Sequence, residues 1–180
     1  ISLIKCGIHW INDEGELLET HVYDFDIISA TEVFIKKYLG EIRSSLSENI
    51  YKTQIIKNIK FTKLPLAWGT DDLSLLDFSQ KGLIKYISKH LVNVRISTES
   101  ISGSILYDQK KSRAINTLRE IIIMKHSNQL PDYFIRKTME DYLYEAYYKG
   151  FSINTKVLLF YLKKLEIINF LKTAKKIYYI

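Results

Sequence analysis

His9, Glu19 and His21 are the residues of the first half whose types and spacing best suit metal binding. They fall on one face of a predicted β-hairpin, with His9 opposite Glu19 and His21 diagonal to His9. Two imidazoles and a carboxylate at this spacing could bind zinc or another divalent metal. Polar residues along one face of a hairpin are also typical of a solvated surface. We therefore predict no metal and no other cofactor, and the metal site stands as the competing hypothesis.

Carboxylates form two further groups. Asp24 and Asp26 share a face near the end of the second hairpin strand, and Asp71, Asp72 and Asp77 form a second acidic group. Carboxylates that lie close together can hold Mg²⁺ for phosphodiester cleavage, so a metal-dependent nuclease is one alternative function. Acids at strand ends and in loops more often cap helices or face solvent. The sequence thus favours a protein that is not an enzyme.

Cys6 is the only cysteine, which excludes an internal disulfide. It falls on the predicted apolar face of the hairpin, as is typical of an inert core thiol. A single free cysteine suits a reducing compartment, and we expect a cytoplasmic protein. The sequence has no P-loop, no G-x-G-x-x-G and no G-x-S-x-G elbow. No apolar run reaches the roughly 18 residues that span a bilayer, so we expect no membrane partner.

Charge is distributed unevenly along the chain. Residues 1–108 carry 12 basic and 14 acidic side chains, a net charge of −2, whereas residues 109–180 carry 14 basic and 6 acidic side chains, a net charge of +8. An anionic partner would account for such asymmetry. A small basic domain with solvated lysines would account for it too.

The elements that position these side chains begin with the hairpin. Residues 3–11 and 16–25 are apolar-rich and flank the turn sequence Asn12-Asp13-Glu14-Gly15. Pairing Asn12 with Glu16 predicts one register for the two strands. In that register the core face consists of Ile4, Cys6, Ile8, Trp10, Leu18, Thr20 and Val22, and the other face includes Lys5, His9, Glu19, His21 and Tyr23.

The rest of the first half predicts mixed α and β structure. A helix begins at Ser29 or Thr31 and carries an apolar stripe as far as Leu46. After it we predict a strand over 55–66, although a helical start is an alternative, then a loop over 68–72, a helix over 79–91 and a strand over 92–97. A polar break at 100–104 precedes the change in charge. We therefore predict an α+β protein with a mixed α/β domain over residues 1–107.

The second half predicts mainly helices. Residues 112–125 form a strong amphipathic segment, and a second helix runs from 132 to about 148. Pro131 favours a helix start, and Gly150 favours a helix end. Five tyrosines occur along this region at helical spacing, namely Tyr133, Tyr142, Tyr144, Tyr147 and Tyr148. We expect these tyrosines to lie in the core and at interfaces, and not to stack on nucleic-acid bases.

Residues 144–153, Tyr-Glu-Ala-Tyr-Tyr-Lys-Gly-Phe-Ser-Ile, resemble the second helix and turn of a helix-turn-helix. Members of that family often have a small residue in this helix, then glycine, then a polar cap. Ala146, Gly150 and Ser152 hold those places here. Residues 154–165 are similar to the third helix, which in the family commonly ends in a leucine–lysine pattern.

The end of the chain completes the resemblance. Residues 167–171 and 176–180 resemble the two strands of a wing, with 172–175 as its tip. Residues 108–180 are thus similar to a winged-helix domain, which implies DNA binding, with the third helix at a groove and wing cations on phosphates. The residues that the resemblance assigns to nucleic-acid contact are Asn154, Lys156, Lys163, Lys164, Lys172, Thr173, Lys175 and Lys176.

The third helix departs from the family in one respect. Residues 157–162 are Val-Leu-Leu-Phe-Tyr-Leu, without the polar side chains that read base edges. The expected function is a non-enzymatic, DNA-binding regulator or an accessory subunit of a replication, repair or transcription complex. Its partners would be nucleic acid, duplex DNA first, and a protein partner or a second copy. A protein-interaction subunit whose winged helix docks a partner is the first alternative.

Overall fold

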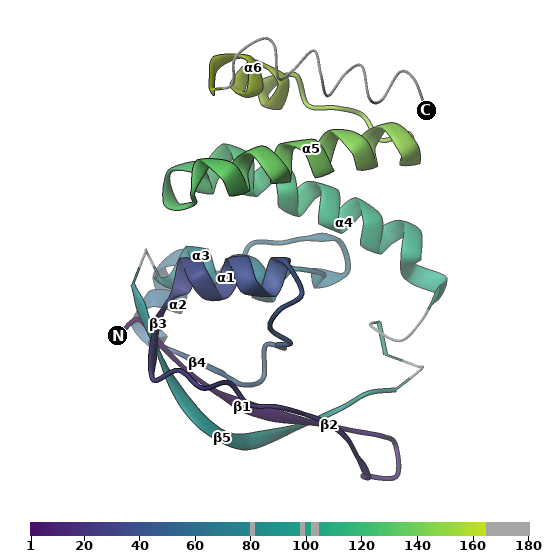
Figure 1. Ribbon diagram of the computed structural model, residues 1–180. Helices are drawn as coiled ribbons and strands as arrows, with labels where there is room; N and C mark the ends of the chain where they lie inside the picture. Colours follow the sequence, from purple (N-terminus) through teal and green to yellow (C-terminus); the bar gives the residue numbers. More distant parts are fainter. Residues whose placement is uncertain (80–81, 98–99, 102–104, 165–180) are drawn as a thin grey trace. The chain divides into compact units, whose positions relative to one another are not determined.

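A computed structural model describes residues 1–79, 82–97, 100–101 and 105–164 (Figure 1). The chain divides into two compact units, Ile1–Gln109 and Lys110–Ile180, where the sequence placed a boundary after residue 107. The first unit combines a sheet with helices, and the described part of the second is helical, in agreement with the predicted mixture of α and β structure. Among the described residues, no helix is long and apolar enough to cross a membrane.

Strand β1, Leu3–Ile11, is the centre of the sheet in the first unit. Its first half pairs with β4, Asn49–Tyr51, and its second half pairs with β2, Leu17–His21, both antiparallel. On its other side β1 runs parallel to β5, Leu83–Arg95, which in turn pairs with β3, Ile27–Ser29. The strand order is therefore β2-β1-β5-β3, with β4 sharing one edge of β1 with β2.

The hairpin is confirmed, but its predicted register is wrong beyond the turn. Asn12 N–H donates to the Glu16 carbonyl at 3.0 Å, as predicted. The register then shifts between Trp10 and Ile11, so that Trp10 pairs with Glu19 and not with Leu18. Because side chains alternate between faces, this one-residue shift moves the β2 side chains to the face opposite the one predicted. Leu18, predicted in the core, is 55% exposed, as is Leu17 beside it at 58%.

Three helices lie on one side of this sheet (Figure 1). Helix α1, Ala30–Tyr38, begins where predicted, because the Ser29 hydroxyl accepts a hydrogen bond from Glu32 N–H, but it ends before the predicted Leu46. Helix α2, Thr53–Ile59, confirms the helical alternative for this region over the predicted strand, and α3, Thr70–Ser79, begins within the predicted loop. The core beneath them is formed by Leu3, Ile8, Val33, Phe34, Leu73, Leu75, Leu76, Phe78, Ile84 and Tyr86.

The helix predicted over residues 79–91 is wrong, since most of this stretch belongs to β5. The register of β5 against β1 shifts on both sides of Gly7, which pairs with His90. A Cβ at Gly7 would lie 2.6 Å from Val22 Cγ2 and 3.0 Å from the Lys89 carbonyl oxygen. Glycine therefore allows the neighbouring strands to approach β1 closely where the pairing is irregular.

The described part of the second unit consists of three main helices. They are α4, Asp108–Ile121, followed by a π-helical segment, Ile122–His126, then α5, Asp132–Lys149, and α6, Thr155–Lys164. Gly150 ends α5 in the left-handed conformation at φ 65°, as predicted from its type. Side chains from all three helices form the core: Ala114, Leu118, Ile122, Ile123, Phe134, Ile135, Met139, Tyr142, Leu143, Ala146, Val157 and Tyr161.

Candidate functional site

Asn154 holds the start of α6 in place. Its Oδ1 accepts a hydrogen bond from Lys156 N–H at 2.9 Å, which caps the helix, and its Nδ2 donates to Glu120 Oε1 on α4 at 2.6 Å. Its backbone N–H donates to the Tyr142 hydroxyl on α5 at 2.9 Å. Both ends of the Asn154 amide are thus engaged within the unit. This residue, which the resemblance assigns to nucleic-acid contact, positions α6 against α4 and α5.

Two lysines of α6 lie on its outer face. Lys156 and Lys163 are exposed, and they stand seven residues apart, about 10 Å along the helix. Val157 and Tyr161 point inward, each 1% exposed. For Lys164, only the backbone belongs to the described structure, and Lys172, Thr173, Lys175 and Lys176 lie outside the described residues, as do both predicted wing strands.

Two leucines share the outer face with these lysines. Leu159 is 58% exposed and Leu162 is 42% exposed. Thr155, at the start of α6, is exposed as well. This face therefore offers cations for phosphates and apolar surface, but none of the carboxamide or guanidinium groups that pair with base edges.

The predicted metal-binding group on the hairpin is not assembled. Because the register shifts, His9 pairs with Thr20, and its Nδ1 lies 2.9 Å from the Thr20 hydroxyl. His21 lies on the other face of the hairpin, where its Nε2 is 3.1 Å from Glu19 Oε2. Among the described residues, no three His, Cys, Asp or Glu side chains are placed to hold a metal ion. The hypothesis of a His9–Glu19–His21 site is therefore wrong.

Of the acidic residues proposed for a nuclease, those of α3 have lysine or hydroxyl partners, and Asp26 pairs with Lys85. Lys37 pairs with both Asp71 and Asp72 at the start of α3, and it is 2.5 Å from Asp72 Oδ1. Burial and the neighbouring Asp71 raise the pKa of Asp72, against the opposing effect of Lys37. Asp77 accepts a hydrogen bond from Thr62 at 2.8 Å. Asp71 and Asp72 thus pair with a lysine, and Asp77 with a threonine, instead of forming an open site for Mg²⁺.

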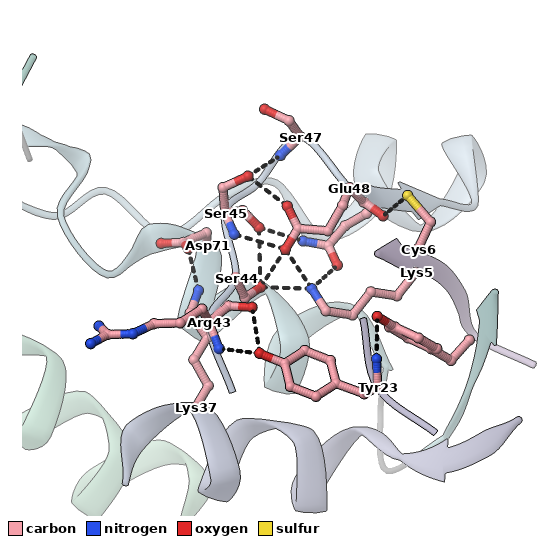
Figure 2. Close-up of polar contacts among 12 residues, drawn as sticks. Lys5, Cys6, Tyr23, Lys37, Arg43, Ser44, Ser45, Ser47, Glu48 and Asp71 are labelled. Atoms are coloured by element: carbon pink, nitrogen blue, oxygen red, sulfur yellow. Dashed lines mark hydrogen bonds and ion pairs between the residues drawn. The ribbon is translucent and has the colours of Figure 1, made fainter. Parts of the chain in front are cut away.

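A buried ion pair between Lys5 and Glu48 is the site that the sequence did not predict (Figure 2). Lys5 Nζ lies 2.7 Å from Glu48 Oε1, and both side chains are only 1% exposed. The other two Lys5 hydrogens reach Ser44 Oγ at 2.6 Å and Asn49 Oδ1 at 3.2 Å. All three protons of the ammonium therefore have acceptors, which is the condition for burying a charge without a large penalty.

Glu48 is held by donors from one short loop. Its Oε1 accepts from the Ser44 hydroxyl at 2.6 Å and from Ser45 N–H at 2.7 Å, and its Oε2 accepts from the Ser45 hydroxyl at 2.5 Å. Burial acts to raise the pKa of Glu48, but Lys5 and these hydrogen bonds outweigh it and lower that pKa. Glu48 is therefore a carboxylate in the folded protein.

The Lys5–Glu48 cluster has a structural role and not a catalytic one. A lysine beside a serine can act as a general base, but only with a free lone pair. Lys5 donates all three protons, and the Ser44 hydroxyl donates to Glu48 instead of Lys5. The cluster joins β1 to residues 44–49, and thus fixes the loop that leads into β4.

The chain matches no protein-family model, no curated protein and no solved structure.

Proposed function

We propose that this is a non-enzymatic, nucleic-acid-associated protein, a DNA-binding regulator or accessory subunit whose C-terminal winged helix contacts phosphates. The observation that carries the proposal is the charge of residues 109–180, a net +8 from 14 basic and 6 acidic side chains. A strongly basic domain is the electrostatic footprint expected of a protein that binds nucleic acid.

The helices of the second unit support the proposal in two ways. The α5–Gly150–α6 segment has the helix–turn–helix order expected from the resemblance. Lys156 and Lys163 are exposed on the outer face of α6, where phosphates could reach them. The remaining cations of the proposed interface are Lys164, Lys172, Lys175 and Lys176, with Thr173 at the wing tip.

Fluorescence anisotropy with a labelled DNA duplex tests this function. Binding should weaken steeply between about 50 and 200 mM salt, because each neutralised phosphate adds about 0.9 to the slope of log K against log salt concentration. Lys156→Ala/Lys163→Ala should lower that slope by about 1.8. The absence of binding by micromolar protein at the lowest salt concentration would overturn the proposal.

A matched control separates a local contact from a general loss of charge. Lys52→Ala/Lys57→Ala removes two exposed lysines from α2 and its N-cap in the first unit. It changes net charge by the same amount and should leave the slope unchanged. If both double variants lower the slope equally, the phosphate contacts do not lie on α6.

Protein docking is the second candidate function for the same helix. The exposure of Leu159 and Leu162 favours it, since an outward apolar face is more typical of a protein interface than of a groove-reading helix. Leu159→Ser/Leu162→Ser should leave the salt slope intact if α6 meets phosphates only through lysines. Loss of a bound protein partner without a change in DNA affinity would favour docking.

A further inference from the structure

One face of α5 carries an exposed row of aromatic and charged side chains. We call this row the tyrosine stripe, and its members are Tyr133, Arg136, Lys137, Glu140, Tyr144, Tyr147 and Tyr148. At 100° per residue, these seven positions fall within about 120° of the helix circumference. The opposite face of α5 is buried in the core of the second unit.

Four of the stripe's members are exposed tyrosines. Tyr133 is 65% exposed, Tyr144 52%, Tyr147 53% and Tyr148 43%. Near the end of the helix their rings contact each other, with centroids 4.2 Å apart for Tyr144 and Tyr148 and 5.3 Å apart for Tyr147 and Tyr148. Tyrosine is enriched at protein interfaces because it offers a large, stiff contact area at a low cost in side-chain entropy.

The charges of α5 argue against nucleic acid as the occupant of this stripe. The helix has three basic and four acidic side chains, whereas the unit as a whole is strongly basic. Along the stripe the charges are segregated: Arg136 and Lys137 come first, and Glu140 follows with Asp141 at its border. Within one chain, Lys137 Nζ lies 3.3 Å from Asp141 Oδ1, an exposed pair of small energetic value.

We propose that the tyrosine stripe binds the same stripe of a second copy of this chain, with the two α5 helices antiparallel. A two-fold axis between positions 138 and 139 pairs residues of the two helices whose numbers have a sum of about 277. Tyr133 then faces Tyr144 of the second copy. Arg136 faces Glu140, and Lys137 faces Asp141, on matching sides of the helix.

The antiparallel arrangement follows from the charges. In a parallel pair each residue would face its own copy, so that cations would meet cations and acids would meet acids. In the antiparallel pair the two cations of each helix meet the two acids of the other. The stripe is therefore complementary to itself in one orientation only, as an interface with two-fold symmetry requires.

The area of the stripe predicts a weak dimer. Tyr133 and Tyr144, which face each other in this register, can bury roughly 200 Å² per chain, and Tyr147, Tyr148 and the flanking charged side chains add to this. Stable interfaces bury about 800 Å² per partner. We therefore expect a dissociation constant in the micromolar range. This inference is independent of the proposed nucleic-acid function.

Sedimentation velocity with two charge-reversed chains tests the arrangement. Arg136→Glu/Lys137→Glu makes the four charged positions acidic, and Glu140→Lys/Asp141→Lys makes them basic. Each variant alone should dimerise at least tenfold more weakly than the wild type, and an equimolar mixture should form heterodimers. Tyr144→Ala, which keeps every charge, should also weaken the dimer at least tenfold.

Lys52→Glu/Lys57→Glu is the matched control, since it reverses two charges at exposed positions in the first unit and should leave dimerisation unchanged. Circular dichroism should show unchanged helix content, because every substituted side chain is at least partly exposed. A wild type that stays monomeric at about 100 μM would overturn the proposal. So would charge-reversed chains that dimerise like the wild type, or a mixture that does not form heterodimers.

Discussion

Replacing Lys5 by Met should destabilise the first unit far more than an ordinary lysine substitution. Met keeps most of the apolar stem and removes the ammonium, which leaves Glu48 buried at 1% exposure without its cation. Removing one partner of a buried ion pair costs about 3–5 kcal/mol. Three donors from Ser44 and Ser45 remain on Glu48, so we expect a loss of about 3 kcal/mol in the free energy of unfolding.

Lys36→Met is the matched control. Lys36 Nζ also pairs with a glutamate, Glu41, at 3.2 Å, but the two side chains are 36% and 52% exposed. An exposed pair contributes at most about 1 kcal/mol. The difference of about 2 kcal/mol between the two variants therefore measures the effect of burial.

Urea unfolding monitored by tryptophan fluorescence measures both variants. The two tryptophans, Trp10 and Trp68, both belong to the first unit, so their signal follows that unit alone. With a slope near 2 kcal/mol per molar urea, Lys5→Met should move the midpoint by about 1.5 M. A midpoint shift no larger than that of Lys36→Met would refute the conclusion that Lys5 is buried in an ion pair.

The pH dependence of the same variant provides a second check. The pKa of Glu48 is lowered in the folded protein, so its contribution to stability is fully present above its unfolded pKa of about 4.3. That contribution is lost as the pH falls through the lower folded value. The stability difference between wild type and Lys5→Met should therefore be constant near neutral pH and shrink below about pH 4. A constant difference down to pH 2 would exclude the ion pair as its source.

Three further predictions concern other parts of the chain. Asn154→Ala removes the cap of α6 and a hydrogen bond to α4, so it should lower the stability of the second unit by about 1–2 kcal/mol. Thermal melts followed by circular dichroism measure this loss, which should be smaller for Asn154→Asp because aspartate can still cap the helix. Partial desolvation and the His90 ring, whose centroid lies 3.6 Å away, lower the pKa of His9. The first unit should therefore lose stability as the pH falls from about 6.5 through that lower value. Urea titrations at several pH values should show a smaller loss for His90→Gln. Gly7→Ala should destabilise the first unit by about 1–3 kcal/mol because its Cβ would meet Val22, and a midpoint equal to that of wild type would show that the strands can separate there.

Local signals predicted the elements whose structure depends on neighbours in sequence. The hairpin turn, the Ser29 cap of α1 and the Gly150 end of α5 each depend on residues within one turn of the chain. The start of α3 could have been found in the same way. Asp71 and Asp72 follow Thr70 and precede an apolar run, and acids in a first turn are typical of a helix start.

Distant partners decided the elements that sequence patterns did not predict. Residues 83–95 contain apolar residues at helical and at strand spacing, and parallel pairing with β1, some eighty positions earlier, selects the strand. Alternation of side chains along residues 3–11 placed Lys5 on the face opposite the predicted core. Its burial depends on Glu48, which no local pattern connects to it. The bulge in the hairpin, which no local pattern predicted, places His9 and His21 on opposite faces.

The composition of α6 limits how its unit could recognise nucleic acid. Its inner face is committed to the core through Val157 and Tyr161, so recognition depends on the outer face. That face presents lysines, which act as point charges, and leucines, which carry no hydrogen-bonding group. Affinity from such a face would come from phosphates and would vary strongly with salt but little with base sequence. Selection of a particular site would then have to come from the wing that the sequence predicts, from DNA shape or from a protein bound to Leu159 and Leu162.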